Sequence, residues 1–150
     1  MYDKEEIFDL TSSETGITET DGQGALWADI WDFTVPVNHA IVLKPTDVFG
    51  CKLVGDDAAE MPAKTQVRVL RGDVTNTERR PVLTPLPYQL VKEFVDKKKI
   101  MRLSITQPVK VGANEHIVVQ VNGADAAGAG DTDASASYFK LRTMRIRKAL

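Results

Sequence analysis

The feature that most constrains the fold is a two-residue hydrophobic period through residues 27–55, a stretch that also holds both tryptophans. Side chains two positions apart in a strand point to the same face of a sheet. The period therefore predicts two or three strands that lay one apolar face on a core. Pro36 and Asn38-His39 predict a bend between two of them. The apolar positions are Trp31, Phe33, Val35, Val37, Ile41, Leu43, Phe49, Cys51 and Leu53.

Length and composition predict one soluble globular domain. A chain of 150 residues can bury about 68–70% of the surface that its unfolded form exposes, so it needs no disulfide to hold a core. Hydrophobic residues make up 43% and charged residues 27%. No apolar run is long enough to cross a bilayer as a helix. The N-terminus is acidic and has no apolar core of a signal peptide, so we expect a protein made in the cytoplasm.

The second half of the chain predicts further strands and one short helix. Residues 65–71 alternate with Val67 and Val69 inward, and the prolines of residues 81–87 exclude a central strand and favour an extended crossover at an edge. A helical period competes with the strand period over residues 88–99, where we favour a short helix over a strand. Turn residues between two alternating runs predict a hairpin over residues 109–121.

The closing residues 138–146 change the phase of their alternation. Phe139 and Leu141 share one parity, whereas Met144 and Ile146 share the other. An extra residue in the strand would explain the change, so we expect a β-bulge near Arg142-Thr143.

Charge is separated between the two ends. Residues 1–25 carry seven acids and one lysine, a balance of −6, whereas residues 140–150 carry five bases and no acid, a balance of +5. The net charge is only −2, which argues against bulk attraction to nucleic acid or anionic lipid. Pairing of the basic end with an acidic protein surface, such as the N-terminal segment of an adjacent subunit, would explain both blocks.

No residue constellation indicates catalysis, a cofactor or a metal. His39 and His116 have no histidine, cysteine or glutamate partner at ligand spacing, so we interpret them as hydrogen-bonded structural residues. Cys51 lies in an apolar strand pattern and reads as a buried thiol. Asn122, Asp125, Asp131 and Asp133 could wrap calcium, but their spacing matches neither the EF-hand loop nor the repetitive aspartate loops of calcium-binding β-helices. We therefore expect no enzyme, no catalytic residue, no cofactor and no metal.

The pattern resembles the small β-sandwich cement or decoration proteins of tailed-bacteriophage capsids. The resemblance rests on a polar N-terminal arm, on Phe33-x-Val-Pro36 leading into Ile41-Val-Leu-Lys-Pro45-x-Asp47-x-Phe49, and on a basic closing strand. It implies an all-β, jelly-roll-like antiparallel β-sandwich with one short helix. It also implies two parts, an extended N-terminal arm of residues 1–25 and a β-sandwich domain of residues 26–150.

The resemblance further implies a function without chemistry. Such proteins bind the outside of a shell, often as trimers or dimers, and clamp neighbouring capsomers with extended termini. It implies the major capsid protein and further copies of this chain as partners, a trimer before a dimer, and the capsid surface of a virion assembled in the host cytoplasm. Neither nucleic acid nor a membrane is an expected partner. Loops 56–64 and 122–137 are candidates for contact or display. The implied partner-binding residues are Tyr2, Glu5, Glu6, Ile7, Phe8, Leu10, Arg142, Arg145 and Arg147.

One alternative from another class is a carbohydrate- or receptor-binding jelly-roll module of a tail or cell surface. That function requires Trp27 or Trp31 to be exposed for stacking on a sugar ring, whereas the capsid function buries most of their area. A small enzyme is a more distant alternative and would need a pocket with converging titratable groups.

Overall fold

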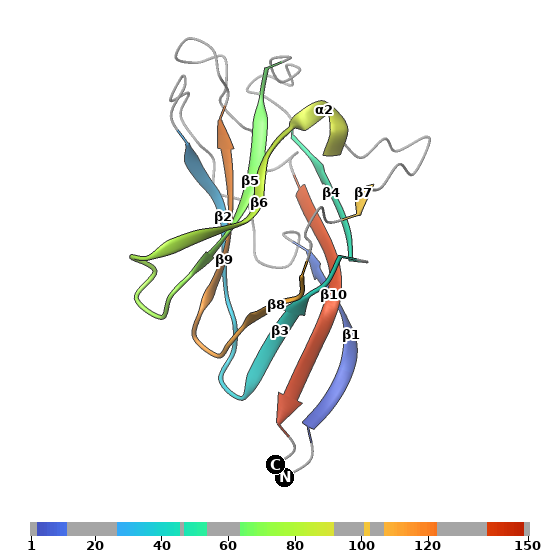
Figure 1. Ribbon diagram of the computed structural model, residues 1–150, viewed down its shortest axis with the longest axis vertical. Helices are drawn as coiled ribbons and strands as arrows, with labels where there is room; N and C mark the ends of the chain where they lie inside the picture. The colour runs from blue at the N-terminus through green and yellow to red at the C-terminus, as the bar shows by residue number, and fades with distance from the viewer. Residues whose placement is uncertain are drawn as a thin grey trace.

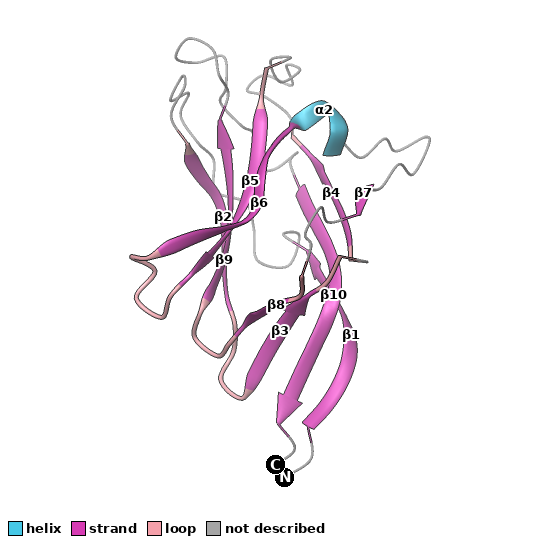
Figure 2. Ribbon diagram, in the orientation of Figure 1, coloured by secondary structure: helices cyan, strands magenta, loops and turns pink. Residues whose placement is uncertain are grey.

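A computed structural model describes residues 3–11, 27–45, 47–53, 64–91, 101–102, 107–122 and 138–148. Its strands form two antiparallel sheets that face each other (Figures 1 and 2). One sheet has the order β2-β9-β5-β6; the other has the order β7-β4-β10-β3-β8, with β1 on β10. The strands are β1 (Asp3–Thr11), β2 (Ala28–Thr34), β3 (His39–Leu43), β4 (Val48–Lys52), β5 (Gln66–Gly72), β6 (Arg79–Pro87), β7 (Met101–Arg102), β8 (Val109–Val111), β9 (His116–Asn122) and β10 (Tyr138–Lys148).

The apolar core lies between the two sheets. Trp31 is 2% exposed, and Val35, Ile41 and Leu43 are fully buried. Cys51 is also fully buried, as its place in the apolar period predicts. The expected fold class, an antiparallel jelly-roll-like β-sandwich, is confirmed: the described chain is almost all strand, in two packed antiparallel sheets.

Two or three strands were predicted in residues 27–55, and the structure has three, β2, β3 and β4. Val37 is an exception, because it is 62% exposed in the turn between β2 and β3. Asn38 has a φ of 64° there, a left-handed conformation that asparagine tolerates better than most residues. The chain reverses at this point, so the strand period no longer sets the direction of the Val37 side chain.

The long strand β10 organises the six-stranded sheet. On one edge it pairs with β1 from Asp3 opposite Lys148 to Thr11 opposite Lys140. Its other edge pairs first with β4 and then with β3, which lie end to end. The turn between them is closed by Asp47, which accepts the Lys44 N–H at 2.8 Å and donates its own N–H to the Lys44 carbonyl at 3.0 Å.

The predicted bulge in β10 is wrong. The register of β10 against β1 continues without a shift through Arg142 and Thr143. The irregularity lies in the partner strand instead, because Arg142 pairs with Val48 whereas Met144 pairs with Val42. Residues 43–47 therefore leave the edge of β10 opposite a single residue, Thr143.

The predicted hairpin over residues 109–121 is also wrong. β8 pairs with β3 in one sheet, while β9 pairs with β2 and β5 in the other. The turn between them still forms, with Asn114 at a φ of 63° and the Glu115 N–H bonded to the Gly112 carbonyl at 3.1 Å. The turn is held to Val35 by two hydrogen bonds, from the Asn114 N–H to the Val35 carbonyl and from the Val35 N–H to the Glu115 carbonyl. At this turn the chain passes from one sheet to the other.

The proline-rich segment and the helix lie close to their predicted places. β6 is an edge strand of the four-stranded sheet, so the exclusion of a central strand is confirmed. The helix α2 (Tyr88–Val91) begins where predicted, and residues 92–99 lie outside the described part. Tyr88 is 2% exposed. Its hydroxyl accepts the Leu53 N–H at 2.8 Å and lies 3.2 Å from the Leu53 carbonyl, so the helix is tied to the end of β4.

Candidate functional site

The predicted partner-binding residues fall on two neighbouring strands. β1 carries the acidic and apolar group, whereas β10 carries the basic group, and the two strands pair along nine positions from Asp3 to Thr11. Tyr2 and loops 54–63 and 123–137, with Asp125, Asp131 and Asp133, lie outside the described residues. The boundary of the predicted arm at residue 25 stays a prediction, but part of that arm is a sheet strand in this chain.

The register between β1 and β10 sets acids opposite bases. Asp3 stands opposite Lys148, Glu6 opposite Arg145 and Asp9 opposite Arg142. Opposite charges at facing positions of antiparallel strands each contribute roughly 0.2–1 kcal/mol. Parts of the acidic and basic blocks, residues 3–11 and 140–148, thus lie on paired strands of one chain.

The tip of this strand pair remains basic. Lys4 stands opposite Arg147, and Arg147 in turn stands opposite His39 of β3 on its other side. The β1 position that faces Arg147 is thus basic rather than acidic. Lys4 and Arg147 are therefore facing positions of like charge, next to the opposite charges of Asp3 and Lys148.

A polar network covers the outer face of the four-stranded sheet. Arg68 stacks over the Trp27 ring at 4.2 Å and donates to Gln120 at 2.7 Å, and Gln120 donates to Asp29 at 2.7 Å. Arg79 binds Asp29 through both carboxylate oxygens at 2.9 Å. The network continues from Arg79 to Asn76 at 3.1 Å, from Asn76 to Asp32 at 2.7 Å, and from Asp32 to His116 at 2.8 Å.

This network spans the whole width of the sheet. Asp29 lies on β2 and Arg79 on β6, and these are the two edge strands. Leu70 and Val118 stand opposite each other on the inner strands, facing away from the core because their neighbours Val69 and Val119 face into it. They are nevertheless 4% and 0% exposed. The polar network therefore lies over a small apolar layer outside the main core.

The electrostatics of the network fit an ion pair that is made in the folded state. Partial burial by itself raises the pKa of Asp29, but hydrogen bonds from Arg79 and Gln120 and the positive charges of Arg79 and Arg68 outweigh it. The net result is a pKa below the ordinary value for aspartate. Asp29 therefore stays ionised and holds the two arginines in place.

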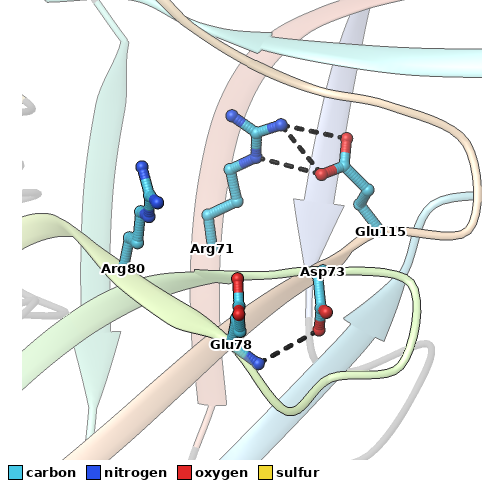
Figure 3. Close-up of a pocket in the computed structure, with 5 residues that line it drawn as sticks. All are labelled: Arg71, Asp73, Glu78, Arg80 and Glu115. Atoms are coloured by element: carbon cyan, nitrogen blue, oxygen red, sulfur yellow. Dashed lines mark hydrogen bonds and ion pairs between the residues drawn. The ribbon is translucent and has the colours of Figure 1, made fainter.

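A hollow of about 180 Å³ opens at one end of the sandwich, lined by Arg71, Asp73, Glu78, Arg80 and Glu115 (Figure 3). Arg71 forms a forked ion pair with Glu115, with its Nη2 at 2.8 Å and its Nε at 3.2 Å from Oε2. The Gly112 N–H also donates to Glu115 at 2.7 Å. The pair ties β5 to the turn that joins the two sheets.

The Glu115 carboxylate is stabilised in its charged form. Burial raises its pKa, but hydrogen bonds from Arg71 and the Gly112 N–H, with the charge of Arg71, lower it below the ordinary value for glutamate. An adjoining hollow of about 410 Å³ shares Arg71 and Glu115 and adds Lys110 and Pro108. The Arg71–Glu115 ion pair therefore lies in the wall that the two hollows share.

The two tryptophans bear on the sugar-binding alternative. Trp31 is 2% exposed, so it has no free ring face for a sugar. Trp27 is only partly exposed, and Arg68 lies over its ring.

Within the described ranges, no three histidine, cysteine or acidic side chains are grouped to hold a metal ion. A search of the same ranges finds no helix with the length and apolarity to cross a membrane.

Sequence reasoning interpreted His116 correctly as a hydrogen-bonded structural residue, but it missed the other hydrogen-bonded residues of both clusters. Asp32 and His116 are 84 positions apart, and Arg71 and Glu115 are 44 apart. The available signal was limited to the polar positions between apolar ones on β2 and β5. Those positions predict an outer face but not which residues meet on it.

No protein-family model matches this sequence, and no curated protein matches it. Among solved structures, the fold is similar to that of VP17, a capsid protein of bacteriophage P23-77. The similarity covers 100% of both chains with a TM-score of 0.61 and 7% sequence identity. A structure of the infectious bursal disease virus Gx strain aligns with 95% of this chain and 32% of that chain, with a TM-score of 0.37 and 10% identity. The similarity to VP17 places the chain in a fold that a phage capsid protein also adopts.

Proposed function

We propose that the protein is a structural component of a virus particle that binds the outside of a phage capsid and stabilises the shell by bridging neighbouring capsomers. The observation that carries this proposal is the similarity of the whole chain to the whole of a phage capsid protein. Because that similarity is one of fold, the proposed capsid binding rests equally on the charged strands β1 and β10. The ion-pair networks and the buried thiol favour a rigid body over a catalytic one.

Binding would stabilise the shell through differential affinity. A protein that binds the closed lattice more tightly than separated capsomers stabilises the lattice by its binding free energy at each site. Symmetry repeats the contact many times over the shell. The major capsid protein is the partner that this function requires, and the capsid surface is the place where it acts.

The proposed contact combines the arm of residues 1–25 with the basic end of β10. β1 lies at the edge of its sheet, and the edge of a sheet presents backbone groups that a neighbour can pair with. Arg147 adds a positive charge that β1 does not oppose, because Lys4 stands across from it. An acidic surface on a capsomer would complement this end of the molecule.

The test is co-sedimentation with emptied shells of the virus that encodes the protein. We expect the purified full-length chain to pellet with the shells and to raise the temperature at which they open. Arg147→Glu should weaken pelleting, whereas Arg80→Glu on the other sheet makes the same charge change and should leave it unchanged. If the wild-type chain neither pellets nor alters the opening temperature, the proposal is wrong.

Deletion of the arm would be a less clean test. Residues 3–11 form a sheet strand in this chain, so their removal would leave one edge of β10 without its partner. A loss of shell binding after deletion could then reflect a disturbed sheet rather than a lost clamp. Single charge substitutions avoid this ambiguity.

A further inference from the structure

We infer that β1 is an exchangeable strand, and that the edge of β10 accepts β1 from a second copy of this chain in the register seen within one copy. This inference rests on the function proposed above, and it adds a second copy of this chain as a partner of the N-terminal arm. It assigns a specific site, the β10 edge from Lys140 to Lys148, and a specific occupant, residues 3–11 of a neighbouring copy.

The first argument is topological. Within the described part of the chain, β1 pairs with β10 and with no other strand. A strand at a sheet edge can leave its own sheet and enter that of a neighbour without loss of hydrogen bonds, since each copy gives one strand and receives one. Exchange of an identical element is a low-cost route to an oligomer for this reason.

The second argument is that charge specifies the register. The observed pairing sets three acids opposite bases (Asp3 with Lys148, Glu6 with Arg145, Asp9 with Arg142) and one lysine opposite an arginine. Sliding β1 by one or two positions in either direction leaves at most two acid–base oppositions in the sequence. The same complementarity would guide β1 onto any free β10 edge, whether in its own chain or in a neighbour.

The third argument is reach. Sixteen residues, 12–27, separate the end of β1 from the start of β2. A chain of that length spans at most about 55 Å when fully extended, which exceeds the distance between neighbouring strands in a sheet roughly tenfold. The intervening chain is therefore long enough to deliver β1 to an adjacent copy. Which pairing dominates depends on the local concentration of neighbouring copies, which is high on a shell.

The test uses two pairs of variants, and each variant carries one added cysteine besides the native Cys51. Ile7→Cys and Met144→Cys lie opposite each other in the register, as do Phe8→Cys and Thr143→Cys. Successive opposite pairs alternate between wider and narrower Cα separations, so one of the two pairs has the geometry that favours a disulfide. Each Ile7→Cys and Met144→Cys chain is unfolded, mixed, refolded and oxidised, and covalent dimers are counted on a non-reducing gel. The Phe8→Cys and Thr143→Cys chains are treated in the same way.

Pairing of β1 with β10 within one chain cannot bring the added cysteines of two chains together, whereas strand exchange can. We expect at least one of the two mixtures to form a covalent heterodimer whose yield rises with protein concentration. The matched control mixes Ile7→Cys with Leu141→Cys, which is three positions out of register. If neither mixture yields more dimer than this control, β1 does not exchange. The native Cys51 is fully buried and remains in all chains.

A double variant makes a negative result decisive. Ile7→Cys with Met144→Cys in one chain should close an internal disulfide if the strands pair as described, and the same holds for Phe8→Cys with Thr143→Cys. Internal closure together with no intermolecular dimer shows that the register is right and overturns the exchange. Failure of both double variants to close would overturn the register and the inference with it. Neither result bears on shell binding, which co-sedimentation measures separately.

Charge reversal gives an independent readout. A chain with Glu6→Arg and Asp9→Arg sets a base opposite Arg145 and another opposite Arg142 within one copy, whereas a chain with Arg142→Glu and Arg145→Glu sets acids opposite Asp9 and Glu6. Each variant opposes pairing with itself, but a mixture allows both β1 strands to meet a β10 of opposite charge. We expect light scattering to detect a hetero-oligomer in the mixture and not in either variant alone; equal masses in all three samples would contradict the exchange.

Discussion

Arg79 on β6 binds both carboxylate oxygens of Asp29 on β2 at 2.9 Å, although these strands are the two edge strands of a four-stranded sheet. On the outer face of the same sheet, Leu70 and Val118 are almost fully buried outside the main core. The ion pair therefore contributes to the fold both as a charge pair and as a cover for apolar surface.

We expect Arg79→Met to lower the free energy of unfolding by about 1 kcal/mol. The pair is partly exposed, which limits its electrostatic contribution, but its loss also removes hydrogen bonds to a carboxylate. Arg80→Met is the matched control, because Arg80 is the exposed next residue and should change stability by less than about 0.5 kcal/mol. Urea denaturation of both variants measures the difference, and equal effects would contradict a specific role for Arg79.

Gly72 is required by the close approach of the β5–β6 turn. A Cβ at this position would overlap the Oδ1 of Asn76 and lie 3.2 Å from the Cβ of His116. We expect Gly72→Ala to destabilise the protein by about 1–3 kcal/mol, the usual cost of overpacking. Asn76 has a φ of 56°, which glycine adopts readily.

The double variant Gly72→Ala with Asn76→Gly isolates this contact. Removal of the Asn76 side chain takes away the atom that the new methyl group would meet. The two changes together should therefore cost less than the sum of the single changes, as a double-mutant cycle in thermal unfolding would show. Additive effects would mean that the overlap with Asn76 is not the cause.

The strands could be predicted from sequence where one face packs on a core. In residues 27–55 and 65–71 the period of two is set by burial of one face, and that signal lies entirely within each strand. The connection at residues 112–115 was misinterpreted because the same turn residues serve a hairpin and a passage between sheets. Only the hydrogen bonds of Asn114 and Glu115 to Val35, far away in sequence, distinguish the two.

The candidate sites could be predicted only in part. The opposite charges of the two termini predicted that the basic end would meet an acidic protein surface, such as the N-terminal segment of an adjacent subunit. In the structure, β10 pairs with β1 of its own chain. Whether that pairing also occurs between copies depends on concentration and not on local pattern. The Arg79–Asp29 network arises from the curl of an edge strand over its own sheet, and no period in the sequence encodes a contact of that kind.

The hydroxyl of Tyr88 holds the start of α2 against the end of β4. It accepts the buried Leu53 N–H at 2.8 Å. We expect Tyr88→Phe to cost about 1–3 kcal/mol, because the substitution keeps the ring but leaves a buried backbone donor without its acceptor. Urea denaturation measures the loss, with Phe33→Leu as a control that alters a partly buried ring without breaking a described hydrogen bond of its side chain. A smaller loss for Tyr88→Phe than for the control would contradict this role.

Acid should weaken the fold through Asp29 and Glu115. Both have a lower pKa in the folded protein than the ordinary value, so the unfolded chain binds more protons as the pH falls. Their contribution is therefore fully present above the unfolded pKa, near pH 4 to 4.5, and is lost as the pH drops through the folded pKa.

We expect Glu115→Gln to be less stable than wild type at neutral pH and to show a shallower loss of stability below about pH 4.5. Glu78→Gln, which removes a carboxylate from the same hollow outside the Arg71 ion pair, is the control and should keep the wild-type slope. Parallel curves for Glu115→Gln and wild type in urea denaturation at several pH values would show that the Arg71 pair does not set the acid limit of the fold.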